Sequence, residues 1–197
     1  MKSITIATLS AMILAGSASA IEINVPGDYT TIQGAIDSIN IGNTFTRITI
    51  DAGTYYENGN LELDGLSGTG NEIEIVGAVD KEGAPAVFVH AVKADKAVFQ
   101  LKYLQNVSVL VENLVLTGGT SLDGAGMWIR SCDDLVVRNC TITGNNAGRW
   151  GGGAYVYDMS TNIPIGVRFV DCVFSGNTAN EGGGLFVDNV FAQRLVI

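Results

Sequence analysis

Apolar and polar positions alternate in an eight-residue pattern that occurs three times in the second half of the chain. The three copies are residues 111–118, 137–144 and 169–176, and each ends in glycine. They are short and rich in β-branched and aromatic residues, which is typical of β-strands and argues against helices. Copies spaced by roughly 30 residues indicate a solenoid, in which each coil covers the apolar side of the next.

A second, shorter pattern follows each copy after a polar, glycine-rich stretch. It consists of glycine, an apolar residue, an aromatic residue and another apolar residue, at residues 126–129, 153–156 and 184–187. The spacing between the second and third copies is the longer one, and we attribute the excess to a loop at residues 157–166. Loops are where solenoids accept insertions. The two patterns together predict an all-β fold built from coils of short parallel strands.

Residues at the same place in successive coils are expected to lie above one another, because paired strands are about 4.8 Å apart. The apolar columns should then fill the interior. These columns are Val111, Val137 and Phe169; Leu114, Cys140 and Cys172; and Leu116, Ile142 and Phe174.

Two polar columns are expected where the coil changes direction. The first consists of Asn113, Asn139 and Asp171, which we place at a bend. The second consists of Gly119, Asn145 and Asn177. We assign this second column to a left-handed turn, because glycine and asparagine enter that backbone region more easily than other residues.

The first twenty residues are predicted to be a signal peptide. Lys2 supplies the positive end, residues 4–15 are apolar but too few to span a membrane, and residues 18–20 form a small-residue cleavage site. The alternative is a buried N-terminal strand. A signal peptide implies export, to the periplasm, the outer membrane or the extracellular space, and we expect no transmembrane segment in the mature chain.

Residues 21–60 are expected to form the N-terminal cap and the first coil. Thr30 or Thr31 can cap a short helix that follows an extended segment at residues 21–25. The apolar side of this helix would consist of Ile32, Ala35, Ile36 and Ile39. The first edge of a solenoid needs such a cover.

Residues 61–197 are expected to form the remaining coils and to be truncated at the C-terminus. Residues 195–197 match residues 135–137, and the chain then stops before the next strand pattern. A final coil without a cover leaves backbone groups and apolar side chains exposed. We therefore expect self-association through this coil.

The chain is acidic, with 11 Lys and Arg residues against 20 Asp and Glu residues and a formal net charge of −9. This balance argues against nucleic acid, anionic lipid and unassisted binding of acidic polysaccharide. Neutral glycans, a divalent cation and a protein receptor remain open as partners.

Three cysteines are an odd number for an exported protein. Cys140 and Cys172 share a column in which the preceding coil has Leu114, so we interpret them as small core residues, with a disulfide as the alternative. The sequence has one histidine and lacks a C-x-x-C motif, which argues against a zinc site.

At these repeats the chain resembles the secreted right-handed parallel β-helix repeat proteins of bacteria, which share the pectate-lyase-like superfold. Their phrase N-C-T-I-T-G-N-x-A followed by G-G-G-I-Y is matched by residues 139–147 with 151–156, and again by residues 171–179 with 182–187. The resemblance implies a right-handed single-stranded parallel β-helix. It is specific for fold and not for function.

Two branches of this group imply different functions. The polymorphic membrane proteins are autotransporter adhesins with F-x-x-N and G-G-A-I repeats, and residues 174–177 and 152–155 are similar to these motifs. The other branch consists of polysaccharide lyases, pectin esterases and polygalacturonases. The chain shares motifs with the first branch and only the scaffold with the second.

The repeats offer little catalytic chemistry, and we predict no catalytic and no metal-binding residue. Asp133 and Asp134 are the one acidic pair, but adjacent strand residues point to opposite faces and a turn explains them equally well. His90 is interpreted as a strand residue. No acidic residue recurs beside an arginine, so we expect no cofactor; calcium held by scattered oxygen atoms stays open.

The candidate binding residues are the aromatic column Trp128, Tyr155 and Phe186. Their neighbours on both sides are apolar in every coil. If those neighbours point inward, the three rings point outward and form a surface for sugar rings or a protein partner. The alternatives are stacking without a ligand, or inward packing.

We therefore expect an exported, non-catalytic surface or adhesion module that presents a rigid face to a glycan or a protein. The alternative is a polysaccharide-active enzyme of the lyase, esterase or glycosidase type. Acidic side chains that converge with each other or with arginine on one face would distinguish the two, and the sequence pattern predicts no such cluster.

Overall fold

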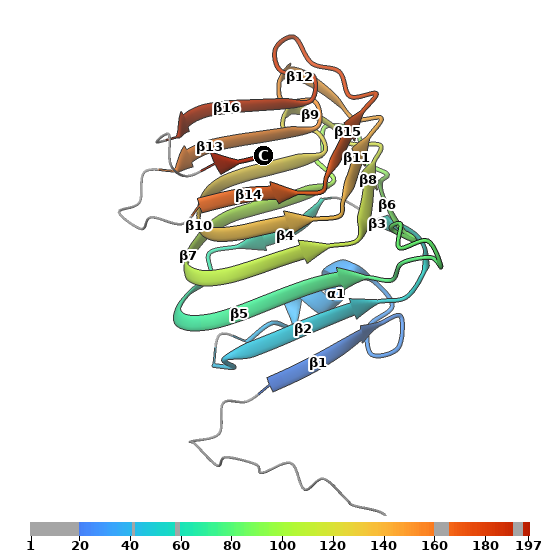
Figure 1. Ribbon diagram of the computed structural model, residues 1–197, viewed down its shortest axis with the longest axis vertical. Helices are drawn as coiled ribbons and strands as arrows, with labels where there is room; N and C mark the ends of the chain where they lie inside the picture. The colour runs from blue at the N-terminus through green and yellow to red at the C-terminus, as the bar shows by residue number, and fades with distance from the viewer. Residues whose placement is uncertain (1–19, 41, 58–59, 160–165, 191–194) are drawn as a thin grey trace, which may run out of the picture.

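The computed structural model describes residues 20–40, 42–57, 60–159, 166–190 and 195–197. They form a parallel β-solenoid of about six turns with one short helix. The turns stack from β1 (Ala20–Val25) at the bottom to β16 (Leu185–Val190) at the top (Figure 1). All pairings between the strands are parallel, and the predicted fold class is confirmed.

Complete turns contribute strands to three faces. The first face consists of β1, β2 (Phe45–Ile50), β5 (Ser67–Gly77), the C-terminal halves of β7 (Phe99–Glu112) and β10 (Met127–Arg138), β14 (Gly166–Val170) and β17 (Leu195–Val196). The second face consists of β3 (Gly53–Glu57), β6 (Val87–Ala91), β8 (Leu114–Thr117), β11 (Thr141–Thr143) and β15 (Val173–Ser175). The third face consists of β4 (Leu61–Asp64), the N-terminal halves of β7 and β10, β13 (Ala154–Met159) and β16. Two short strands, β9 (Thr120–Asp123) and β12 (Asn146–Trp150), pair with each other between the second and third faces.

The predicted apolar columns fill the interior. Val137 pairs with Val111 below and Phe169 above, and Ile142 pairs with Leu116 below and Phe174 above. The members of the two lower coils are buried, whereas Cys172 and Phe174 in the upper coil are half-buried. Removing this apolar surface from water is the main stabilising contribution, at roughly 1.5–3 kcal/mol for each large side chain.

All three cysteines are unpaired, which supports the interpretation of Cys140 and Cys172 as core residues. Their sulfur atoms contact backbone carbonyls, with 3.3 Å from Cys140 Sγ to Arg138 O and 3.4 Å from Cys172 Sγ to Val137 O. Burial raises the pKa of Cys140, and it raises the pKa of Cys132 to about 12. These thiols therefore behave as small apolar groups.

The left-handed turn lies elsewhere than predicted. Asn113, Asn139 and Asp171 have positive φ angles of 61°, 46° and 53°, so the first polar column provides the left-handed bend. At the second column, the left-handed backbone conformation belongs to the glycine that precedes each member, such as Gly144 with φ 65°. The assignment of Asn145 and Asn177 to left-handed backbone is therefore wrong.

Asn145 and Asn177 instead use their side chains to join neighbouring coils. Asn145 is 1% exposed, accepts a hydrogen bond from Gly119 N at 2.9 Å and donates one to Leu116 O at 3.1 Å. Asn177 repeats the donation one coil higher, to Ile142 O at 2.8 Å. A side-chain amide has both a donor and an acceptor, which explains why asparagine suits this inward position.

Glycine at the start of the second pattern is required by close packing of successive coils. A Cβ on Gly126 would lie 2.3 Å from the carbonyl oxygen of Gly153, and one on Gly153 would lie 2.3 Å from that of Gly184. No other residue fits at these two positions without moving the coils apart.

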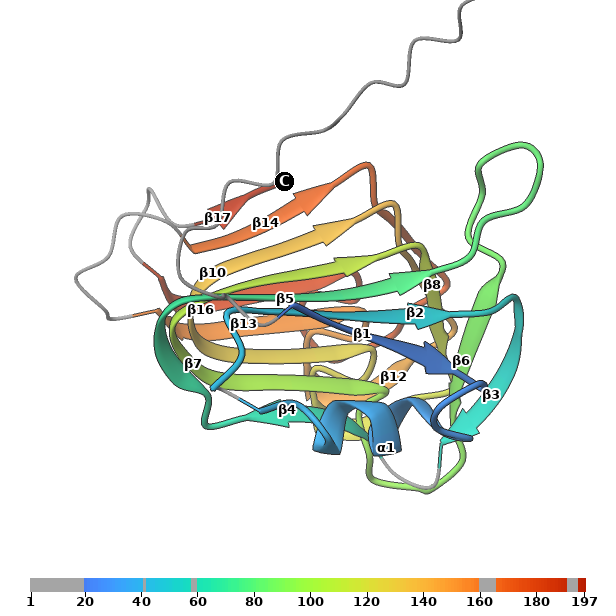
Figure 2. The ribbon, with the colours of Figure 1, turned by 90° about the horizontal axis from the view of Figure 1, so that it is seen from below.

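The N-terminal cap is present as predicted. Helix α1 (Ile32–Asp37) begins after Thr31, whose side chain accepts a hydrogen bond from Gly34 N at 3.1 Å. The helix lies at the N-terminal end of the solenoid on the side of the third face, next to β4 (Figure 2). Its buried residues are Ile32, Ala35 and Ile36.

Two further expectations concern residues that the structure describes only partly. Residues 1–19 lie outside the described residues, so the predicted signal peptide stays a prediction. Of the expected loop at 157–166, the first three residues belong to β13 and the last begins β14. Among the described residues, no helix is long and apolar enough to cross a membrane.

Candidate functional site

The predicted aromatic column lies on the third face. Trp128 on β10 pairs with Tyr155 on β13, and Tyr155 pairs with Phe186 on β16. Their neighbours Met127 and Ile129 are fully buried, so the alternation places the rings on the outer side of the sheet. The register of the column is confirmed, and inward packing is excluded.

The rings form a packed cluster and not an exposed stack. Tyr155 is only 4% exposed, because the rings of Trp150, Tyr157 and Phe186 surround it at 5.8, 5.4 and 5.8 Å between centroids. Trp150 stacks on Phe186 at 5.5 Å, and Trp128 meets Tyr157 at 6.3 Å. We call Trp128, Trp150, Tyr155, Tyr157 and Phe186 the aromatic cluster.

Burial within this cluster affects the phenol of Tyr155. It raises the pKa of Tyr155 to about 12, and the carboxylates of Asp188 and Asp123 add to the rise. Tyr155 thus stays neutral at physiological pH and acts as the packed centre on which the outer rings rest. The surface offered to a partner comes from the half-buried Trp128, Trp150, Tyr157 and Phe186.

Two members of the aromatic cluster were not among the predicted site residues. Tyr157 fell within the expected loop, although it continues the alternation of Tyr155 and Val156 and could have been found from that signal. Trp150 ends β12, which belongs to a different sheet, and no sequence signal places it against Phe186.

Positively charged side chains surround the rings. The guanidinium of Arg130 lies between the rings of Tyr103 and Tyr157, at 5.0 and 4.7 Å from their centroids. Arg149 lies over Trp150 at 3.8 Å. Cation–π contacts of this kind hold both partners in place, and they add polar donors to an otherwise apolar surface.

Lys102 completes this edge of the third face. Its Nζ lies 5.9 Å from the ring centroid of Trp128 and forms ion pairs with Glu62 at 2.5 Å and Asp64 at 3.0 Å. Burial alone would lower the pKa of Lys102, but the two carboxylates outweigh burial and the pKa is raised. Lys102 therefore stays charged and is committed to its acidic neighbours.

Acidic and basic side chains converge on the first face, which the repeat pattern did not predict. A cleft of about 390 Å³ there is lined by Glu72, Glu74, Ser108, Val109, Leu110, Asp134, Val136, Arg138 and Arg168. Glu72, Ser108 and Asp134 occupy one column of the sheet. The expectation that no such cluster exists is wrong, because Glu72 and Glu74 come from β5, which precedes the readable repeats.

Most charged groups of this first-face cleft take part in ion pairs, Glu74 with Arg47 and Arg138 with Glu112. Arg168 contacts Asp134 Oδ1 at 2.9 Å, and Ser108 Oγ donates to Asp134 Oδ2 at 2.8 Å. Asp133 points the other way, is 2% exposed and accepts a hydrogen bond from Asn106 N at 2.9 Å. The two adjacent aspartates thus lie on opposite faces, as predicted.

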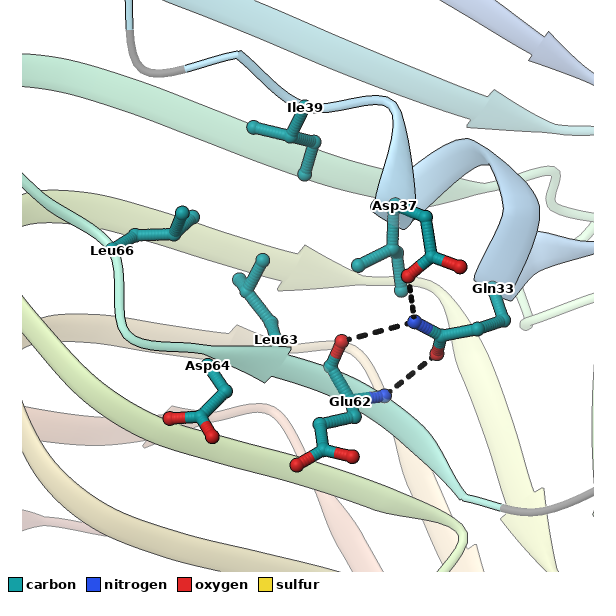
Figure 3. Close-up of a pocket in the computed structure, with 8 residues that line it drawn as sticks. Gln33, Asp37, Ile39, Glu62, Leu63, Asp64 and Leu66 are labelled. Atoms are coloured by element: carbon teal, nitrogen blue, oxygen red, sulfur yellow. Dashed lines mark hydrogen bonds between the residues drawn. The ribbon is translucent and has the colours of Figure 1, made fainter.

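A second cleft, of about 350 Å³, lies between α1 and β4 (Figure 3). The side-chain amide of Gln33 bridges the two elements: its Nε2 donates to Asp37 Oδ1 at 2.7 Å and to Glu62 O at 3.1 Å, and its Oε1 accepts from Glu62 N at 2.7 Å. These contacts take the place of a neighbouring strand along the edge of β4. We therefore interpret this cleft as part of the cap.

The remaining candidates carry less chemistry. His90 lies on β6, as expected for a strand residue, and stacks on Tyr56 with 5.3 Å between ring centroids. Within the described ranges, no three His, Cys, Asp or Glu side chains are grouped so that they could hold a metal ion.

Comparison with known proteins gives one match, to the Chlamydia polymorphic membrane protein repeat at residues 171–188. Neither the curated proteins nor the solved structures contain a significant match. The matched residues include β15 and the aromatic residue of β16, so the match covers part of one turn of the solenoid. It supports a parallel β-helix repeat protein and shows no specific function.

Proposed function

We propose that the chain is an exported, non-catalytic β-helix module that binds a partner at the cell surface through its third face. The observation that carries this proposal is the aromatic cluster with its flanking Arg130 and Arg149. Such a cluster buries apolar area on contact, and it costs little conformational entropy because the rings are already held.

The partner is proposed to be a glycan or a surface protein. Aromatic and arginine side chains are enriched in the centres of protein interfaces, and aromatic rings also stack on sugars. The formal charge of −9 disfavours polyanions. Parallel ladders hold the face rigid, so the partner meets a preformed surface.

Substitution of Trp128 tests this proposal. Wild-type protein and a Trp128→Ala variant would be applied to immobilised neutral polysaccharides, acidic polysaccharides and extracellular-matrix proteins. We expect the wild type to bind a glycan or a protein in this panel and the variant to bind it at least tenfold more weakly. Tyr56→Ala is the matched control, because Tyr56 is 68% exposed on the second face. Equal loss in both variants would contradict the use of the third face.

A second candidate is a polysaccharide-active enzyme, which the first-face cleft favours. Glu72 and Asp134 lie two strands apart, so their Cα atoms are separated by roughly 10 Å, close to the carboxylate separation of inverting glycosidases. Incubation with polysaccharides, with and without calcium, tests this alternative. Product that disappears in Asp134→Asn and persists in Glu112→Gln would overturn the non-catalytic proposal.

A further inference from the structure

A third cleft, of about 210 Å³, opens beside Trp128 where two turns meet. We call it the tryptophan cleft, and its lining residues are Gln100, Ser121, Leu122, Asp123 and Trp128. Gln100 is the direct strand neighbour of Trp128, whereas Asp123 ends β9. The cleft thus lies between Trp128 on the third face and strand β9, which precedes β10 in the chain.

Asp123 is held in a fixed orientation. Arg149 binds it in a bidentate way, with 2.9 Å from Nε to Oδ1 and 2.5 Å from NH2 to Oδ2, and the Asp123 side chain is 15% exposed. Arg149 in turn lies over Trp150 at 3.8 Å, and Trp150 stacks on Phe186. An ionised carboxylate has about four acceptor positions, so two remain for hydroxyl donors from a ligand.

The wall of the cleft combines apolar and polar groups in a defined way. Leu122 is 61% exposed, and Gln100 carries an amide that both donates and accepts. Gly124 has φ 59°, and a Cβ there would lie 3.0 Å from Cδ1 of Trp128. A glycine at this position therefore allows the indole to lie against the backbone of the turn.

We infer that the tryptophan cleft binds one neutral hexose ring of a surface glycan, an inference that rests on the proposed function and names its ligand class. A hexose ring has an apolar face of C–H groups that suits an indole, and a rim of hydroxyls that suits Gln100 and Asp123. The cleft is smaller than a drug-sized pocket, in keeping with one ring.

The charges on the cleft select against acidic sugars. Its five lining residues include a carboxylate and no cation. The cations beside it are already paired, Arg149 with Asp123 itself and Lys102 with Glu62 and Asp64. A uronic acid or a sulfated sugar would bring a second negative charge close to Asp123, and the acidic surface of the whole chain adds to this repulsion.

Titration with methyl glycosides tests this inference on the protein of residues 21–197. The probes are the methyl glycosides of glucose, galactose and mannose, with methyl glucuronide as the acidic comparison, and binding is followed by saturation-transfer NMR. We expect at least one neutral glycoside to bind and methyl glucuronide to bind at least tenfold more weakly. Trp128→Ala and Asp123→Asn should each weaken neutral binding at least tenfold, whereas Tyr56→Ala should leave it unchanged.

The variants separate this inference from the proposed function. Asp123→Asn has nearly the same size as the wild type, and circular dichroism of each variant would confirm the fold. Glycoside binding that survives both cleft variants, or a preference for glucuronide, would overturn the inference. So would the failure of every neutral glycoside to bind. In each of these cases the proposed function still stands if the polysaccharide and protein panel shows binding that depends on Trp128.

Discussion

Asparagine serves two different purposes within one coil. Asn139 adopts φ 46°, a left-handed conformation that asparagine accepts more easily than most residues. Asn145 has no such strain, but its buried amide joins Gly119 N below and Asn177 Oδ1 above. Asn139 matters chiefly for its backbone, although its amide also donates to Asn113 Oδ1 at 2.8 Å and to Gly83 O at 3.1 Å. Asn145 matters for its buried side chain.

Replacement by glycine distinguishes the two purposes. Glycine accepts positive φ, so Asn139→Gly should lower the free energy of unfolding by only about 1 kcal/mol, through loss of the exposed and partly buried hydrogen bonds to Gly83 O and Asn113 Oδ1. Asn145→Gly should cost about 3 kcal/mol, because it leaves buried backbone groups of neighbouring coils without partners. Urea denaturation of both variants measures this difference. Equal costs would show that the two positions have the same purpose.

The buried thiols predict a loss of stability at alkaline pH. The pKa of Cys132 rises from 9.0 to about 12 on folding, so the unfolded chain releases its proton at lower pH than the folded one. The stabilisation is complete below pH 9 and is lost as the pH rises above that, by up to about 1.4 kcal/mol per pH unit for each thiol. Urea denaturation at pH 8 and pH 10 should show the decrease, and Cys132→Ala should reduce it. If Cys132→Ala lost as much stability between pH 8 and pH 10 as the wild type, the buried thiol of Cys132 would not be the cause of the loss.

At the scale of elements, the polar contact between α1 and β4 depends on one side chain. Gln33 pairs with both backbone groups of Glu62, and thereby covers the free edge of β4. Gln33→Ala should remove these two hydrogen bonds and weaken the protection of the amides of β4 by about 1–2 kcal/mol. Hydrogen exchange measures this, with Asp37→Ala as a control that keeps both contacts to Glu62. Unchanged exchange in Gln33→Ala would show that α1 covers the edge without this clamp.

The elements that the sequence predicts well are those within the repeats. Trp128, Tyr155 and Phe186 occupy the same place in the pattern, and their register follows from the alignment. The long strands β7 and β10 were not predicted as single bent strands, because their bends use positive φ at Tyr103 and Ser131. Tyrosine and serine at such positions carry no sequence signal.

The candidate sites were also predicted only where they lie within the repeats. The cleft of the first face was missed because the column that joins Glu72 to Asp134 extends into turns with no recognisable repeat. The packing of Trp150 on Phe186 joins two different sheets, and neither alternation nor spacing encodes a contact of that kind. A sequence repeat predicts which residues stack on one another in successive turns. Contacts between different faces depend instead on the angles at which the chain bends.

On the scale of the whole molecule, the three faces differ in chemistry although they share one backbone. The first face carries ion pairs such as Arg47 with Glu74 at 2.9 Å, and the third carries the aromatic cluster. Substitutions on one face should leave the others intact, because each side chain contacts chiefly its own column and the turn above or below. This independence is what makes Tyr56, on the second face, a valid control for Trp128.

The upper end of the solenoid differs from the lower end, where α1 covers the coil. Among the described residues, no strand lies beyond β15, β16 and β17, and the side chains of Val173, Val187 and Val196 are 53%, 38% and 55% exposed. Strand edges with apolar side chains are templates for pairing with a second copy. We propose that the polypeptide of residues 21–197 self-associates through this end.

Sedimentation velocity over a range of concentrations tests this proposal. We expect the sedimentation coefficient of the 21–197 polypeptide to increase with concentration, and Val187→Lys to suppress the increase because a lysine on an edge strand opposes pairing. Phe88→Lys is the matched control, since Phe88 is 42% exposed on the second face, away from this end. The amides of Leu185–Val187 should exchange faster at low concentration than those of the central strand β10, because only one side of β16 is paired among the described residues. A strictly monomeric polypeptide with equally protected amides would show that this edge is already satisfied within one molecule.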